Sequence, residues 1–374
     1  MIKVVHLITS LSIGGAEMTL YKLLSQFDRS RFSHSVICLT GAGAIGNEIE
    51  TLGVPVHYLN MRRGSLGVGG VFSLTRLLRN ERPQVMLTWL YHADLLGLIS
   101  SKLSRVPAVA WNIRCGYMDM SKYSNITSMV VKALARLSPY PNVVVANSKA
   151  GVDEHKKLGY HPKRWEVIPN GFDTDKFRPD KTKREKLAKE LNLSENNFLI
   201  GMIGRYDAMK DHATFLKAAA LLSKTEDNVR FILAGPLVDN NNQELVELVK
   251  SLGLDKRVYL LGARDDVADI MAALDIHALP SYGEGFPNVL AEAMACGAFC
   301  VSTDVGDAAI ILGDAGFVVP PKNPEAMADA LLEAMNMEPQ KRDHMLLESR
   351  RRIVEHYSLQ VAADRYQELL LELS

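Results

Sequence analysis

A glycine-rich turn that opens into an apolar helix is the first stretch of this sequence that could do chemistry. Gly283 and Gly285 flank a glutamate, and residues 288–295 have the pattern of a buried helix. Pro287 suits the first turn of that helix, where its missing N–H costs nothing. Such a junction leaves backbone N–H groups unpaired at the positive end of a helix dipole, which favours a bound phosphate. The simpler alternative is a turn that only caps a core helix.

Two glutamates belong to the same stretch. Glu284 lies in the turn, and Glu292 lies in the helix among valine, leucine, alanine and methionine. A carboxylate in apolar surroundings is costly to bury unless it accepts hydrogen bonds. Hydroxyl groups of a ligand could donate those bonds, so the pair predicts a ligand that carries hydroxyls.

Two cations stand in a second promising position. Arg205 and Lys210 follow the apolar run 198–203, between an expected strand and an expected helix. Ligands of parallel α/β sheets gather at this end of the strands. Arginine binds a phosphate as a fork and lysine as a point charge, and a charged hydrogen bond contributes about 1.5–3 kcal/mol. The two side chains therefore predict a pyrophosphate site, against the alternative of a solvated loop.

The amino-terminal half carries weaker signals of the same kind. Gly14 and Gly15 follow a strand-like run at 2–8 and would let a ligand approach the backbone closely. Their spacing does not match Gly-x-Gly-x-x-Gly, so no nicotinamide cofactor is predicted. His92 and Arg114 each follow an expected strand, where a side chain can reach a ligand.

Metal and nucleoside-triphosphate sites are not indicated. Asp173 and Asp175 follow a Pro-Asn-Gly turn, where carboxylates more often cap the turn than bind a metal. The Gly-x-x-x-x-Gly-Lys-Ser/Thr loop of one large class of triphosphatases does not occur. The four cysteines lack the spacing of zinc ligands, and we expect reduced thiols in a cytoplasmic protein.

Strand and helix patterns alternate through the chain, which predicts an α/β protein with two Rossmann-like, doubly wound parallel-sheet domains facing across a cleft. We expect a first domain at 1–178, a polar linker at 179–195, a second domain at 196–355, and a closing helix at 356–374 that could return to the first domain. The predicted strands are 2–8, 35–39, 54–59, 85–89, 108–111, 143–146, 198–203, 229–234, 258–261, 276–279, 299–302 and 317–319. The predicted helices are 16–27, 45–52, 69–80, 92–104, 122–137, 148–158, 211–223, 242–251, 266–273, 288–295 and 324–336.

The formal net charge of the 374 residues is zero, but the charges are unevenly distributed. Residues 1–180 carry 22 Lys and Arg against 13 Asp and Glu, so this part has a charge of +9 and the rest has −9. Basic amphipathic helices are expected at 64–82 and 122–136, and no apolar run approaches the roughly 20 residues that span a bilayer. These features favour peripheral docking on an anionic membrane surface, the alternatives being solvated helix faces and halves that complement each other.

The motifs occur in an order that resembles one enzyme family along nearly the whole chain. Gly-Gly-Ala-Glu at 14–17, His-Ala-Asp at 92–94, Ile-Pro-Asn-Gly at 168–171, Arg205 with Lys210, and two glutamates seven residues apart after Gly283 are similar to the retaining family 4 glycosyltransferases of GT-B fold. The glutamate pair with Gly-Phe-Pro between its members is the most specific of these motifs.

The resemblance implies a role for each matching residue. Arg205 and Lys210 would hold the pyrophosphate of a nucleotide-sugar donor, Glu284 would contact the transferred sugar together with His92, and Glu292 would bind the ribose. Arg114 would lie on the acceptor side. Further donor contacts are implied for Gly14, Gly15, Gly285, Phe286, Pro287, Asn288, Val289 and, near the base, Arg264.

The implied activity is transfer of a hexose-type sugar, with retention, from a nucleotide-diphosphate sugar to a glycan or polyprenyl-linked acceptor in the synthesis of surface polysaccharides or glycoconjugates. The nucleotide sugar is a co-substrate, and no cofactor, metal or nucleic acid is expected. The chain departs from the family at 304–309, where many relatives carry Gly-Gly and a nearby Glu, so the purpose of this loop stays open. It also departs at Cys115, where a subgroup has His.

Two other functions fit the same pattern. A nucleotide-sugar 2-epimerase would bind the same donor and could use His92 and Glu284 as acid and base. A non-catalytic subunit would bind a nucleotide sugar or glycan without reaction. The identity of the base, the sugar and the acceptor stays open at this point.

Overall fold

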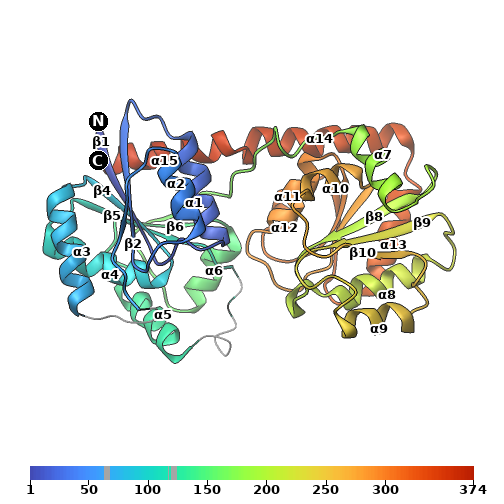
Figure 1. Cartoon of the computed structure of the whole chain (residues 1–374), viewed down its shortest axis with the longest axis horizontal. Helices are drawn as coiled ribbons and strands as arrows, with labels where there is room; N and C mark the ends of the chain where they lie inside the picture. Colours follow the sequence, from blue (N-terminus) through green and yellow to red (C-terminus); the bar gives the residue numbers. More distant parts are fainter. Residues whose placement is uncertain (63–67, 117, 119–123) are drawn as a thin grey trace. The chain divides into compact units, whose positions relative to one another are not determined.

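The computed structural model describes residues 1–62, 68–116, 118 and 124–374, which form two compact units. The first unit contains residues 1–171 together with 359–374, and the second contains 172–358. Each unit is a parallel sheet with helices on both faces, as Figure 1 shows.

The first unit has a seven-stranded sheet in the order β3-β2-β1-β4-β5-β6-β7, and all of its ladders are parallel. Its strands are β1 (Ile2–Ile8), β2 (Phe32–Cys38), β3 (Val56–Tyr58), β4 (Val85–Trp89), β5 (Ala108–Ile113), β6 (Val143–Ala146) and β7 (Trp165–Val167). Its helices are α1 (Gly15–Gln26), α2 (Ala44–Thr51), α3 (Val68–Glu81), α4 (Tyr91–Ser104), α5 (Asn125–Leu137), α6 (Lys149–Lys157) and α15 (Leu359–Leu373).

The strands of this sheet are apolar on both faces because helices cover both. Leu7 of β1 belongs to the core shared with α3, α4, α5 and α6. Ile8, its neighbour, belongs to the core on the other face, shared with α1, α2 and α15. Successive side chains of a strand point to opposite faces, so neighbouring residues such as Leu7 and Ile8 can both be apolar and buried only in a sheet covered on both faces.

The second unit has a six-stranded parallel sheet in the order β10-β9-β8-β11-β12-β13. Its strands are β8 (Phe198–Ile203), β9 (Val229–Ala234), β10 (Val258–Leu260), β11 (Ile276–Leu279), β12 (Phe299–Thr303) and β13 (Gly316–Val319). Its helices are α7 (Lys181–Glu190), α8 (His212–Leu222), α9 (Gln243–Ser251), α10 (Val267–Ala273), α11 (Asn288–Ala295), α12 (Ala308–Leu312), α13 (Pro324–Met335) and α14 (Pro339–Tyr357), with a 3₁₀ turn at Ala208–Lys210.

The linker predicted at 179–195 is wrong. This segment contains α7, which packs on the second unit by burying Leu187 and Ala188. Arg184 donates hydrogen bonds to Asp275 at 2.8 Å and to the carbonyl of Ala273 at 2.7 Å. The helix is attached largely by such charged contacts, and its few apolar residues leave no periodic pattern in the sequence.

The carboxyl-terminal segment divides between the two units. α14 ends at Tyr357 in the second unit, and α15 begins at Leu359 and packs in the first. The buried Tyr366 of α15 accepts a hydrogen bond from Asn112 of β5 at 2.9 Å. None of the described helices is long and apolar enough to cross a bilayer.

Candidate active site

Both sheets have a point where the strand order reverses, and several of the residues singled out above follow strands at these points. In the first unit the reversal lies between β1 and β4, and in the second it lies between β8 and β11. Loops that follow the two strands at such a point diverge and leave a crevice in which ligands of open α/β sheets bind. His92 follows β4, Lys210 follows β8, and Glu284 follows β11.

A lysine–glutamate pair bridges the reversal point of the second unit. Lys210 Nζ donates to Glu284 Oε1 at 2.6 Å, and Ser281 Oγ donates to the same oxygen at 2.8 Å. The side chains of Lys210 and Glu284 are 21% and 12% exposed. Both groups are thus held in place and largely desolvated, which strengthens their interaction with a charged ligand.

The loop that carries the two cations is held by hydrogen bonds to its backbone groups. Asp207 caps the 3₁₀ turn through Met209 N at 2.9 Å, and Asp211 caps α8 through Thr214 N at 3.2 Å. Met209 O also accepts a hydrogen bond from Tyr282 N at 2.9 Å, which joins this loop to the one after β11. Lys210 is therefore fixed in position from both sides.

Arg205 is more exposed than Lys210. Its side chain is 61% exposed, and its nearest carboxylate contact is Asp207 Oδ2 at 3.5 Å from Nε. Such a guanidinium keeps most of its donors available to an anion in solution. Arg205 therefore lies on the same loop as Lys210, and most of its N–H donors face solvent.

The glycine-rich turn is held by the loop after β12, whose purpose the sequence left open. Asp307 N donates to the carbonyl of Gly285 at 2.9 Å. Gly306 has φ +55°, and a Cβ there would collide with the carbonyl oxygens of Glu284 and Gly285. A glycine is needed at this position both for its backbone conformation and for the close approach. The 304–307 loop therefore sets the position of Glu284.

The start of α11 presents backbone rather than side chains. Phe286 is buried and stacks on Phe172 with ring centroids 6.0 Å apart, so its ring belongs to the core. Pro287 is the N-cap residue, and its side chain makes no capping hydrogen bond. Asn288 is exposed, Val289 is half-buried, and Glu292 lies half-buried one turn further along. An uncapped helix start beside a cationic loop is suited to a phosphate.

Arg264 is committed to protein carboxylates. Its guanidinium donates to Asp266 Oδ1 at 2.7 Å and to Glu190 Oε1 at 2.6 Å. These hydrogen bonds raise the pKa of Arg264. The structure places this arginine in a junction between α7 and the start of α10, not with Lys210 and Glu284.

Two buried histidines lie close enough to Lys210 to feel its charge. Burial, with the lysine as a second cause, lowers the pKa of His277 to about 3 and that of His212 to about 4. Neither ring has a hydrogen-bond partner among the described residues. Both histidines are therefore neutral near pH 7 and add no charge to the site.

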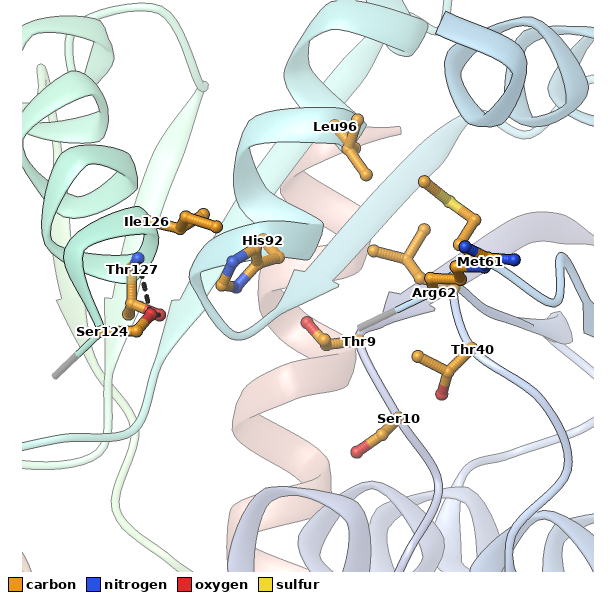
Figure 2. Close-up of a pocket in the computed structure, with 11 residues that line it drawn as sticks. Thr9, Ser10, Thr40, Met61, Arg62, His92, Leu96, Ser124, Ile126 and Thr127 are labelled. Carbon is orange, nitrogen blue, oxygen red and sulfur yellow. Dashed lines mark hydrogen bonds between the residues drawn. The ribbon is translucent and has the colours of Figure 1, made fainter. Parts of the chain in front are cut away.

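The first unit has a pocket of about 580 Å³ at its own reversal point (Figure 2). In Figure 2, His92 projects from the start of α4 between the start of α5 and the loop after β1. The pocket is lined by Thr9, Ser10, Leu39, Thr40, Met61, Arg62, His92, Leu96, Ser124, Ile126 and Thr127.

His92 is the titratable side chain of this pocket that sequence reasoning singled out. Burial lowers the pKa of His92, and its Nε2 has no hydrogen-bond partner within the described part of the chain. The residue before α4 begins, Leu90, has φ +74°, a conformation that costs energy for a leucine. Asp94 points away into the core, where Thr88 donates to it at 2.5 Å and burial raises its pKa well above the usual value.

The two glycines before α1 have different surroundings. A Cβ on Gly14 would collide with the carboxylate of the buried Glu17, which accepts a hydrogen bond from Ser10 at 3.0 Å. A Cβ on Gly15 would meet nothing within 4 Å, and its φ is not positive. A shift of the Glu17 carboxylate would relieve the contact at Gly14, while Gly15 has open space in front of it.

Arg114 lies in an internal network rather than in the His92 pocket. Its guanidinium donates to Thr19 Oγ1 at 3.0 Å and to Asn170, and it lies over the ring of Trp89 at 5.7 Å. Burial lowers its pKa. These contacts join α1 and the 168–171 turn to the sheet, so Arg114 stabilises the fold of the first unit.

Possible metal ligands do not cluster in the described ranges, where no group of three His, Cys, Asp or Glu side chains could hold an ion. Cys38, Cys296 and Cys300 are buried free thiols. Burial raises the pKa of each, to about 12 for Cys296. They are therefore protonated near pH 7.

Comparison with known proteins gives matches to two family models. The model "Glycosyltransferase Family 4" matches residues 13–176, and the model "Glycosyl transferases group 1" matches residues 197–337. The chain belongs to the family 4 glycosyltransferases. Its relatives include an Escherichia coli UDP-Gal:alpha-D-GlcNAc-diphosphoundecaprenol alpha-1,3-galactosyltransferase, which is 26% identical over 81% of this chain and 79% of that protein.

A second relative and two solved structures are also similar to the chain. A Campylobacter jejuni N,N'-diacetylbacillosaminyl-diphospho-undecaprenol alpha-1,3-N-acetylgalactosaminyltransferase is 26% identical over 69% of each chain. The crystal structure of Anabaena HepE in complex with UDP and glucose has a TM-score of 0.82, 25% identity, and full coverage of both chains. A Rickettsia africae glycosyltransferase has a TM-score of 0.85 at 18% identity, which shows the common fold. The GT-B fold predicted from the sequence is confirmed.

In this glycosyltransferase several polar residues of the two reversal points were not singled out from the sequence. Ser281 and Thr303 are buried, and Thr303 Oγ1 donates to the carbonyl of Ser281 at 2.5 Å. Thr9 directly follows β1, Thr40 lies two residues after β2, and both line the His92 pocket. Their position after predicted strands was the available signal, but small hydroxyl residues at strand ends are too common to stand out.

Proposed function

We propose that this glycosyltransferase takes a hexose-type sugar from a nucleotide-diphosphate sugar bound in its second unit and transfers it to a lipid-linked glycan. The observation that carries the proposal is the Lys210–Glu284 pair at the reversal point of the second sheet. A largely buried cation beside an uncapped helix start suits a diphosphate. A carboxylate within reach of that cation suits the hydroxyls of the attached sugar.

The donor roles follow from the surroundings of each side chain. Lys210 and Arg205 bind the pyrophosphate together with the amides at the start of α11. Glu284 accepts hydrogen bonds from the transferred sugar, and Glu292, further along α11, binds the ribose. Uracil is the base we propose, because the similar Anabaena protein was solved with UDP and glucose. Arg264 has no place in this scheme, since its donors are occupied by carboxylates.

The acceptor is proposed to be a glycan on a polyprenyl diphosphate. Two of the relatives carry diphosphoundecaprenol-linked acceptors in their names, and a Staphylococcus aureus relative is named for capsular polysaccharide biosynthesis. The first unit offers the His92 pocket, whose hydroxyl groups can bind sugars. Such an acceptor is anchored in a bilayer, so the enzyme works peripherally at the cytoplasmic surface of a membrane. Arg114 acts on this side only by holding α1 in place.

The reaction is proposed to proceed with retention and without a metal. The bond between the anomeric carbon and the diphosphate oxygen breaks, and the acceptor oxygen bonds to the same face of that carbon. The leaving diphosphate takes the acceptor proton. Positive charge on the sugar and negative charge on the diphosphate grow together, so fixed cations at the diphosphate stabilise the transition state most. Glu284 is held by Lys210 and Ser281, which favours hydrogen bonding to sugar over nucleophilic attack.

Thermal unfolding with a panel of nucleotide sugars tests the donor site. UDP-hexoses should raise the Tm, because a ligand that binds only the folded state stabilises it by RT ln(1 + [L]/Kd). GDP-mannose should shift it less. Lys210→Met should abolish the shift, and Lys217→Met, a change of the same kind on the neighbouring α8, should keep it. No shift with any nucleotide sugar, or the same shift in the Lys210 variant, would refute the proposed donor site.

A further inference from the structure

The outer faces of three adjacent helices in the first unit share an unusual composition. α3, α4 and α5 lie side by side on one face of the sheet (Figure 1). Their exposed charged side chains are all cationic, and the half-buried Glu81 lies 3.4 Å from His57. The exposed cations of these helices are Arg76, Arg79, Lys102, Lys132 and Arg136.

These cations are not neutralised by neighbouring carboxylates. Within the described residues none of the five forms an ion pair, whereas α6 on the same face pairs Lys156 with Asp153 and Lys157 with Glu154. Directly after α3 and α4, the exposed Arg82 and Arg105 line a further pocket together with Arg79. The outer faces of α3, α4 and α5 therefore concentrate positive charge that pairs with no carboxylate among the described residues.

Large apolar side chains are exposed among the cations. Met129 on α5 is 71% exposed and Phe72 on α3 is 69% exposed. Ile99 and Leu103 of α4 and Ile126 of α5 are also exposed. Apolar residues that project between Lys and Arg are the combination that inserts into the headgroup region of an anionic bilayer.

The opposite face of the same unit provides an internal comparison. There α2 exposes Glu48 and Glu50, and α15 exposes Asp364, Glu368 and Glu372 with Arg365 as its exposed cation. A bilayer with anionic lipids would repel this face and attract the face made by α3, α4 and α5. The exposed charges of α2 and α15 are thus mainly acidic, whereas those of α3, α4 and α5 are basic.

We propose that the surface formed by the outer faces of α3, α4 and α5 docks on an anionic phospholipid bilayer. α5 links this surface to the proposed acceptor site, because the exposed Ile126 near its start also lines the His92 pocket. Docking by this surface would hold the pocket where a glycan on a membrane lipid arrives. The charge and the exposed apolar side chains favour a bilayer as the partner, and the purpose of the docking rests on the proposed function.

Vesicle sedimentation of the full chain tests the surface. The wild type should bind vesicles of phosphatidylcholine with phosphatidylglycerol, bind pure phosphatidylcholine weakly, and lose binding as salt rises. Since each Lys or Arg near an anionic surface strengthens binding roughly fivefold, Lys132→Glu/Arg136→Glu should weaken it at least about thirtyfold. Lys22→Glu/Lys163→Glu makes the same charge change away from α3, α4 and α5 and should stay within about fivefold of the wild type.

A second pair of variants tests the apolar part. Phe72→Ser/Met129→Ser should weaken binding to the anionic vesicles, while Leu347→Ser, an exposed leucine of the second unit, should not. Absence of wild-type binding at low salt, or equal losses in the test and control variants, would overturn the docking surface. An enzyme that transfers sugar to a detergent-dissolved acceptor but does not bind vesicles refutes this inference alone. An enzyme that binds vesicles but transfers no sugar upholds this surface and refutes the proposed function.

Discussion

The Lys210–Glu284 pair allows stability and catalysis to be separated by a double-mutant cycle. Lys210→Met leaves the carboxylate of Glu284 largely buried without its cation, and Glu284→Gln leaves the ammonium without its anion. Breaking a fully buried pair from one side costs about 3–5 kcal/mol. With 21% and 12% of the two side chains exposed, we expect each single variant to lose about 1–3 kcal/mol in the free energy of unfolding.

The double variant should regain most of that stability, because two neutral side chains of similar shape often replace a buried pair at little cost. Transfer activity should not return. Removing one preorganised charge-stabilising group typically lowers kcat about 10²–10³-fold, so all three variants should fall by at least about 100-fold.

The assay for stability has to follow the second unit. The three tryptophans at positions 89, 111 and 165 all lie in the first unit, so their fluorescence reports on the wrong half. Far-UV circular dichroism includes the signal of the helices of the second unit, so it can follow urea unfolding of that unit. Release of nucleoside diphosphate measures the transfer activity. A double variant that recovers both stability and turnover would show that the pair is only structural, and the reasoning would be refuted.

Three further predictions concern single positions. Gly15→Ala should leave the free energy of unfolding within about 0.5 kcal/mol of the wild type yet lower transfer at least tenfold, because the family resemblance implies a donor contact at Gly15 and the space before it is open. An unchanged kcat/KM would contradict this. Gly306→Ala should cost at least about 1–2 kcal/mol because of its positive φ and should impair transfer by shifting Glu284, which urea unfolding and steady-state kinetics would check. His277 has a folded-state pKa of about 3 against an ordinary value of 6.5, so the unfolded chain binds more protons and stability falls as pH drops below 6.5. Between pH 6.5 and about 4.5 the loss should be roughly 1–3 kcal/mol, and His277→Leu should flatten this part of the stability curve; an equal slope in both proteins would rule the histidine out.

The fold could be predicted from the sequence where burial on both faces left a continuous pattern. The apolar runs at 2–8, 198–203 and 229–234 match β1, β8 and β9 to the residue. The three-residue edge strand β7 was missed, because it is only half-buried and reads as part of a turn. α14 was missed as well: it buries Ser349, Ile353 and Tyr357, too few residues for its 19 positions to show a periodic pattern.

The site was predictable only in part, and the reason is again physical. Glycine spacing and charge at strand ends indicated Lys210 and Glu284 separately, but only the sheet order brings loops 74 residues apart into a hydrogen bond. The role of Gly306 depends on a close approach between two loops, which leaves no local signal. Arg264 stood in a promising loop, but its partners Glu190 and Asp266 come from the helix that was mistaken for a linker and from the start of α10.

The central claim is tested most directly by mass spectrometry of an acceptor after incubation with purified enzyme. The substrates are a UDP-hexose panel and a short polyprenyl-diphosphate-linked sugar, with Lys210→Met as the negative control. We predict that the acceptor gains the mass of one hexose-type sugar, that UDP is released in equal amount, and that neither happens with the variant. Release of UDP and an isomerised free sugar without any acceptor would instead indicate an epimerase. No change in any acceptor with any nucleotide sugar would contradict the proposal.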